Sequence, residues 1–221
     1  MEWKALNCGL APSPREMHAS VAYKNVLLIS GGRSEDGPVL SDIWVLSLIP
    51  QTFRDVSGCP LKWERMDSMN LPSGRCAHSC SIVEVPNNVD GYELYLMILG
   101  GFEEGGIAST AMTAKLLLLE REGNRLPFDA TETEWIKVNF IETFGLRFGH
   151  AICGISQQFM DSLINNDRYR PLFLSKPDIQ ERLSQLKRDP QFSKEKRLCG
   201  IVIFGGVNIE QDFGDLWVLF P

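Results

Sequence analysis

The chain contains only three histidines, the side chain that most often serves as a general base or a metal ligand. Each histidine follows an arginine by three positions, in the pairs Arg15 and His18, Arg75 and His78, and Arg147 and His150. Three histidines could together bind a metal ion, but each occupies the same place in its own copy of a repeated pattern. We therefore expect each one to bond to neighbouring backbone in its own unit. No catalytic residue, metal or other cofactor is predicted.

Cysteines are the other candidates for nucleophiles, redox centres or zinc ligands, and the six are Cys8, Cys59, Cys76, Cys80, Cys153 and Cys199. No two of them form a Cys-x-x-Cys pair, so neither a zinc ribbon nor a redox motif is indicated. The first residues lack the basic-then-apolar layout of a secretory signal. We therefore expect reduced, mostly core-filling thiols in a cytoplasmic or nuclear protein. Cys76 and Cys80 flank His78 within an expected strand, where burial is a simpler explanation than catalysis.

A four-part pattern that surrounds each Arg-x-x-His element occurs three times. A tryptophan stands twelve residues before each arginine, at Trp3, Trp63 and Trp135. After each histidine comes an apolar run that ends in a glycine pair, at 31–32, 100–101 and 205–206. An Asp-x-Trp-x-Leu segment follows at 42–46 and 215–219, whereas the middle copy has an apolar run at 113–118 without the Asp and Trp. Such ordered recurrence indicates a repeat protein.

Each copy of the pattern predicts four short strands, because its apolar runs are rich in Val, Ile, Leu and aromatic residues and are bounded by turn residues. We name them a (after Arg-x-x-His), b (before Gly-Gly), c (Asp-x-Trp-x-Leu) and d (around the tryptophan). A four-stranded unit has an apolar face that it cannot bury alone, so neighbouring units must stack. The fold class predicted is all-β.

The order Arg-x-x-His, Gly-Gly, Asp-x-Trp and a terminal Trp resembles the kelch repeat of kelch β-propellers. The resemblance implies one kelch-repeat domain over 1–221, with repeats that begin near 12, 72 and 144 and with residues 2–6 as a lone d-type strand. It also implies that the repeated Arg, His, Gly and Trp side chains mainly support the four-stranded blades. The expected function is a non-catalytic protein-interaction module, scaffold or adaptor.

The alternative within the same resemblance is a propeller-fold enzyme or a metal-binding specifier-type protein. Kelch-fold oxidases bind copper through His and Tyr, and the plant specifier proteins bind iron through a Glu, Asp and His cluster. This chain has no histidine outside its repeats and shows neither set of ligands.

Three repeats are fewer than the four to eight blades of known propellers. Three arrangements therefore stay open. The chain is a piece of a longer six- or seven-bladed protein, or two copies associate to complete a ring, or the blades form an open arc whose edges are covered.

Two surfaces are candidates for partner binding. Alternating strand directions place the b–c and d–a loops at one end of each unit, and the three b–c loops carry six acids: Glu35, Asp36, Glu103, Glu104, Glu210 and Asp212. Such a cluster would attract a basic protein segment, although acids in turns also serve solubility alone. A partner's carboxylate could also reach Arg15, Arg75 or Arg147 near the d–a loops.

The second surface is an insertion at 156–198, between strands a and b of the third repeat. Its nine basic and six acidic residues give a net charge of +3, whereas the whole chain carries −6. A short helix is predicted at 177–188, and the insertion could dock a partner, cover an edge or lie on the surface. The overall negative charge argues against nucleic acid, and no run of 18 apolar residues predicts a membrane span.

Overall fold

The computed structural model describes residues 2–3, 5–35, 37–48, 59–87, 91–108, 111–118, 128–129, 134–138, 145–155 and 200–219. In this part of the chain the regular structure is antiparallel β-sheet, interrupted by one 3-10 turn, η2, at Asp67–Met69. The all-β prediction is confirmed for the residues described. No helix among them is long and apolar enough to cross a membrane.

The first sheet contains the first copy of the repeat. Its strands β1 (Ala19–Tyr23), β2 (Val26–Ser30), β3 (Ile43–Leu48) and β4 (Leu61–Arg65) pair in chain order. The register sets Ala19 opposite Ser30 and Leu46 opposite Trp63. These four strands coincide with the predicted a, b, c and d segments.

The second sheet is larger and is built from the middle copy. Its strands are β5 (Ser79–Asn87), β6 (Gly91–Leu99) and β9 (Ala111–Leu118), and both β10 (Phe128–Asp129) and β11 (Trp135–Val138) pair with β9. Between β6 and β9 a small hairpin forms from β7 (Phe102–Glu103) and β8 (Gly106–Ile107). Strand c therefore survives here without its Asp and Trp, because the apolar side chains suffice to build it.

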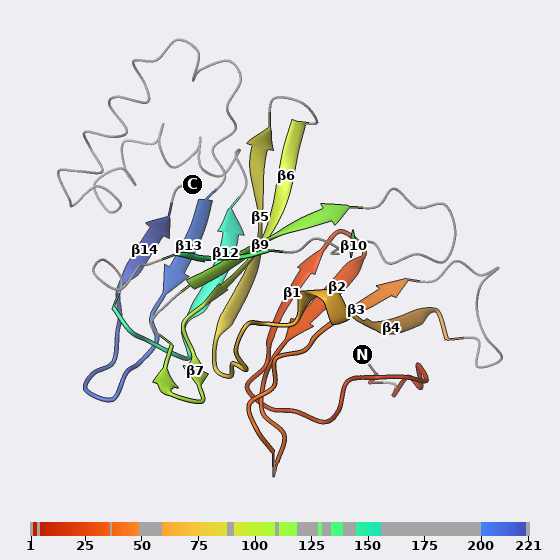
Figure 1. Cartoon of the computed structure of the whole chain (residues 1–221), viewed down its shortest axis with the longest axis horizontal. Coiled ribbons are helices and arrows are strands. Elements are labelled where there is room, and N and C mark those ends of the chain that lie inside the picture. Colours follow the sequence, from red (N-terminus) through yellow and green to blue (C-terminus); the bar gives the residue numbers. More distant parts are fainter. Residues whose placement is uncertain are drawn as a thin grey trace.

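The third sheet has three described strands, β12 (Ala151–Ile155), β13 (Gly200–Phe204) and β14 (Leu216–Leu219), again paired in chain order. The predicted insertion at 156–198 and the helix at 177–188 lie outside the described residues. Figure 1 shows the three sheets side by side, with the first on the right and the third on the left.

Two apolar cores lie between the sheets. Alternate residues of β1, β2 and β3, such as Leu28 and Val45, face Leu96 and Ile98 of the second sheet. A smaller cluster joins the second sheet to the third through residues that include Leu99 and Ile203. This period-two alternation buries both faces of the middle sheet, so the sheets stack as repeats of one unit.

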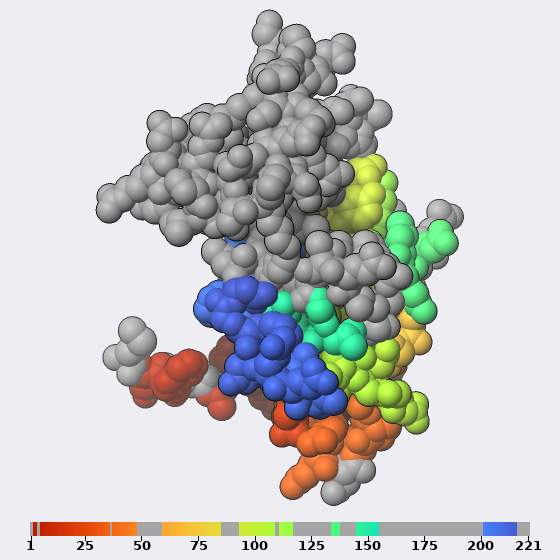
Figure 2. Space-filling view, turned by 90° about the vertical axis from the view of Figure 1, so that its left-hand side faces the viewer, coloured from red at the N-terminus to blue at the C-terminus, as the bar shows by residue number. Residues whose placement is uncertain are grey.

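The strand predicted for residues 2–6 is not formed. Glu2, Trp3, Ala5 and Leu6 have no strand assignment, and Trp3 is 99% exposed. A strand requires a hydrogen-bonding partner, and this segment has none among the described residues. Figure 1 places the N-terminus beside β4, and Figure 2 shows the N-terminal residues standing away from the body of the molecule.

Candidate functional site

The arginines of the first and third copies are fixed by the acids of their own repeats. Arg15 donates from Nη1 and Nη2 to Asp42 at 2.7 and 2.9 Å, and also to the Gly31 carbonyl at 2.9 Å. Arg147 repeats this with Asp215 at 2.6 and 3.1 Å and with the Gly205 carbonyl at 3.0 Å. Each guanidinium thus ties the start of strand a to the end of b and the start of c.

The middle copy lacks the matching aspartate, and Glu103 takes its place. Arg75 donates to the Glu103 carboxylate at 3.4 Å and to the Gly100 carbonyl at 3.3 Å, while Ser73 donates to the same carboxylate oxygen at 2.6 Å. Burial lowers the pKa of Arg75, and the charge of Glu103 opposes that effect. A buried guanidinium needs an anion, so an acid on the neighbouring hairpin replaces the missing one.

This arrangement removes the three arginines from the candidate binding surface. The side chains of Arg15, Arg75 and Arg147 are only 4%, 1% and 1% exposed. Burial alone would raise the pKa of Asp42, but bonds from Arg15 and Trp44 lower it below its ordinary value. A partner's carboxylate would have to displace these internal acids from a buried site. We therefore assign the arginines a structural role.

Two of the three histidines bridge neighbouring sheets. His78 Nε2 shares a hydrogen bond with Ser30 Oγ of the first sheet at 2.8 Å, and His150 Nε2 shares one with Ser79 Oγ of the second sheet at 2.6 Å. The sequence predicted bonds to neighbouring backbone instead, and these serine partners were not foreseen. His18, with no sheet before it, is exposed.

Burial keeps the two bridging histidines neutral. Desolvation, followed by the charge of Arg75, lowers the pKa of His78 to about 3. Desolvation and the charge of Arg147 lower the pKa of His150 to about 4. Both imidazoles are therefore uncharged at neutral pH and are held as hydrogen-bonding parts of the sheet interfaces.

Backbone bonds repeat between the sheets in the same way. Gly32 N donates to the Arg75 carbonyl at 2.8 Å, and Gly101 N donates to the Arg147 carbonyl at 3.1 Å. Ala77 N donates to Met17 O at 2.8 Å, and Gly149 N donates to Ala77 O at 2.9 Å. The first sheet therefore contacts the second, and the second contacts the third, through equivalent backbone groups.

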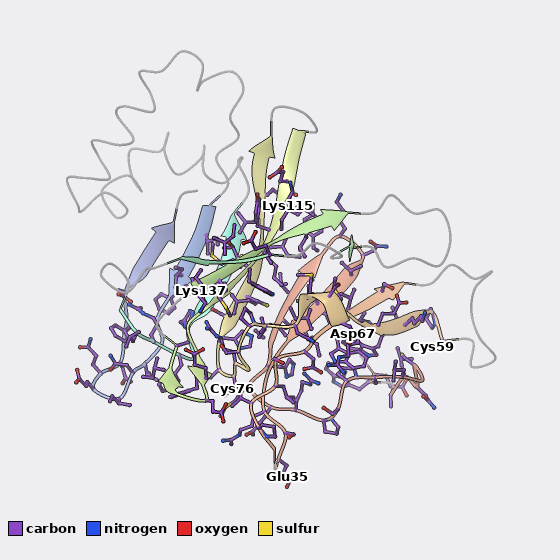
Figure 3. The ribbon with its side chains drawn as sticks, viewed as in Figure 1. Glu35, Cys59, Asp67, Cys76, Lys115 and Lys137 are labelled. Carbon is purple, nitrogen blue, oxygen red and sulfur yellow. The ribbon has the colours of Figure 1, made fainter. Side chains whose placement is uncertain are left out.

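The acidic side chains gather at one end of the molecule. Figure 1 shows the β2–β3 connection, the β7–β8 hairpin and the β13–β14 connection together at its lower end, and Figure 3 shows Glu35 at the tip of the first of these. The exposed acids of these loops are Glu35, Glu104, Glu210 and Asp212. Glu103 is half-buried and committed to Arg75, so it is not part of this surface. Asp36 lies outside the described residues.

The cysteines near His78 are buried, in agreement with the structural interpretation. Cys76 and Cys80 are 5% and 6% exposed, and burial raises the pKa of both thiols, that of Cys80 to about 12. Such thiols are poor nucleophiles at neutral pH. Within the described ranges, no three His, Cys, Asp or Glu side chains are grouped as metal ligands would be.

Comparison with known proteins gives one weak similarity. A stretch of 99 residues, 45% of this chain, is 24% identical to the human protein "Multiple epidermal growth factor-like domains protein 8". The match covers 3% of that protein's length, so the chain corresponds to a small part of it. No family model matches the chain. This similarity assigns no family.

Proposed function

We propose that the chain is a kelch-type β-propeller module of three blades that binds a basic segment of a protein partner and catalyses no reaction. The observation that supports this most strongly is that two sets of polar residues have different surroundings. The repeated Arg, His and Gly groups form hydrogen bonds within and between the sheets, whereas exposed carboxylates that belong to the loops lie at one end of the molecule. We expect the module to act as a scaffold or adaptor in the cytoplasm or nucleus.

The binding surface in this proposal is the acidic end, defined by Glu35, Glu104, Glu210 and Asp212. All four acids are exposed. Loops held on a rigid sheet scaffold are suited to recognition, because the scaffold fixes their positions before a partner arrives. Carboxylates of one sign at one end would speed the approach of a cationic segment and would make its binding sensitive to salt.

The outer face of the third sheet supports the idea that further repeats complete the ring. Ser30, Leu99 and Phe204 each precede a glycine pair; the first two are 0% and 2% exposed under the next sheet, but Phe204 is 55% exposed. Gly206 N, the equivalent of Gly32 N and Gly101 N, has no acceptor among the described residues. We propose that a further repeat supplies that acceptor and covers Phe204.

Any unit with the Arg-x-x-His pattern that docks on that face, a second copy of this chain included, meets no hydroxyl there for its histidine. If the first sheet of a second copy docked there, its His18 would need a hydroxyl like those of Ser30 and Ser79. The equivalent positions of the third sheet are Ala151 and Phe204, which carry no hydroxyl.

Neutralising three acids of the acidic end tests the proposed binding surface. The variant Glu35→Gln/Glu104→Gln/Glu210→Gln leaves Glu103, and therefore Arg75, undisturbed. Affinity for a fluorescein-labelled deca-arginine peptide, measured by fluorescence anisotropy at low salt, should fall about 5- to 20-fold, as expected for three exposed charge pairs.

The matched control is Glu2→Gln/Glu84→Gln/Glu134→Gln, which removes the same charge from exposed glutamates outside the acidic end. Because both variants have the same net charge, a general attraction to the negative chain would weaken equally in both. An equal loss of affinity in the two variants would contradict the proposed surface.

A further inference from the structure

Two cysteines that are distant in the sequence meet at the edge of the first sheet. Cys8 Sγ and Cys59 Sγ lie 2.9 Å apart, although 51 positions separate the two residues in the chain. A disulfide bond is about 2.0 Å long, so the sulfurs need to approach by only about 0.9 Å to form one. The sequence offered no sign of this pair, because the spacing matches no cysteine motif.

Local structure holds each thiol in place. The side chain of Asn7 accepts a hydrogen bond from Gly9 N at 3.1 Å, and Gly9 has a φ of +71°, so the backbone turns sharply around Cys8. On the other side, Cys59 is 9% exposed and stands two residues before β4. Figure 3 shows Cys59 beside the side chains of the N-terminal segment.

Further along the chain, Arg15 anchors the segment that carries Cys8. Its Nε donates to Ser13 O at 3.1 Å and its Nη2 to Ser13 Oγ at 3.2 Å. Because Arg15 is itself bonded to Asp42, the chain is fixed to the first sheet within a few residues of Cys8. The thiol pair therefore lies at the end of a short anchored segment.

We propose that Cys8 and Cys59 form a reversible disulfide that ties the N-terminal segment to the β4 edge of the first sheet. The oxidant is a small-molecule disulfide such as oxidised glutathione. The thiolate of Cys8, the less buried of the two, attacks one sulfur of the oxidant, forms a mixed disulfide and releases one glutathione thiol. The thiolate of Cys59 then attacks Cys8 Sγ and releases the second. The two protein thiols thus lose two protons and two electrons, and the oxidant is reduced to two thiols.

This bond would determine where the N-terminal residues can go. Trp3 is five residues from Cys8, so in the oxidised form it stays within about 18 Å of the tether, even when the chain is fully extended. The bond would hold the segment beside β4, the outer strand of the first sheet, and away from more distant sheet edges. Reduction would release residues 2–8, which could then pair with another sheet edge. The disulfide would therefore control which sheet edge the N-terminal segment can reach.

Oxidation followed by mass spectrometry tests the disulfide directly. The full chain is incubated with oxidised glutathione, denatured and treated with N-ethylmaleimide, and its intact mass and tryptic peptides are measured. We expect two fewer maleimide groups than in the reduced chain, and a linked pair of peptides that span residues 5–15 and 55–62. The oxidised chain should melt about 5–10 °C above the reduced one.

Two cysteine variants, a test and a control, show whether the disulfide joins Cys8 to Cys59. Cys8→Ser should abolish the linked pair and the difference in melting temperature, whereas Cys153→Ser, which removes an exposed thiol elsewhere, should change neither. The proposal is wrong if oxidation removes no pair of thiols, if the linked peptides contain other cysteines, or if Cys8→Ser keeps the melting difference. Peptide mapping of the unsubstituted chain decides the question even if a variant does not fold.

Discussion

His78 and His150 are buried bases that each join two sheets through a serine hydroxyl. The sequence indicated a structural role for the histidines because they recur with the repeat, but it did not indicate their partners. Ser30 lies on strand b of the first sheet and Ser79 on strand a of the second, so the two serines do not recur with the pattern. The structural role of Glu103 was not predicted for a similar reason. In the middle copy it takes the role that Asp42 and Asp215 have in the other copies, but it lies at a different position in the repeat.

Because both histidines are neutral in the folded chain, acid should destabilise it. Their folded pKa values, about 3 and about 4, lie below the usual 6.5, so the unfolded chain binds more protons below pH 6.5. The contribution of the two histidines is complete above pH 6.5 and is lost progressively as the pH falls toward 4. Urea unfolding should show a loss of about 1–2 kcal/mol per histidine between pH 7 and 5.

Two substitutions separate the contribution of the buried histidines to the pH dependence of stability from that of carboxylates, which titrate in a neighbouring pH range. His150→Gln should reduce the dependence on pH by about half, and His18→Gln is the comparison, because His18 is exposed and bridges no sheets. An identical pH dependence for both variants would show that buried histidine is not its cause.

At the scale of the element, the glycine pair after strand b lies close both to the start of strand a in its own repeat and to the next sheet. Gly101 has a φ of +90°, and a Cβ added there would lie 2.5 Å from Cys76 O and 2.7 Å from His78 N. Its own N–H bonds to Arg147 O of the third sheet. Glycine is therefore required at this position both by the backbone conformation and by the close approach of residues 76–78 of its own repeat.

Gly101→Ala should lower the free energy of unfolding by about 2–4 kcal/mol, because it adds backbone strain to a steric clash. Gly105→Ala, in the adjacent β7–β8 turn, is the matched control, since a Cβ there meets nothing within 4 Å. It should change stability by less than about 0.5 kcal/mol. Urea denaturation of both variants measures the difference, and similar stabilities would contradict the role given to the glycine pair.

The strands were the part of the fold that could best be predicted from the sequence, because each is specified locally by an apolar run between turn residues. The a, b and c segments of all three copies became strands, even where the middle copy lost its Asp and Trp. The segment at 2–6 has a similar composition but formed no strand, since a strand also depends on an available edge. Pairing of this kind is a long-range property that local composition does not determine.

At the scale of the whole molecule, three sheets stack through repeating bonds and leave two unlike surfaces. The outer face of the third sheet exposes Phe204, at the position where the other two sheets are covered by a neighbour. The lower end in Figure 1 exposes carboxylates, which fits contact with a cationic partner. From loop composition the sequence predicted a cluster of acids at one end and added the three arginines near it; the structure shows that Glu103 is half-buried and that the arginines are buried.

NMR of the 15N-labelled chain, titrated with the deca-arginine peptide, shows residue by residue whether the acidic end is the binding surface. We expect the amide signals of 33–35, 102–107 and 207–213 to shift, and these shifts to become smaller as salt is added. Signals around the β1–β2 turn at 23–26 and the end of β5 near Asn87, at the other end of the sheets, should stay in place. Shifts confined to those distant turns, or no binding at low salt, would show that the acidic end is not the binding surface.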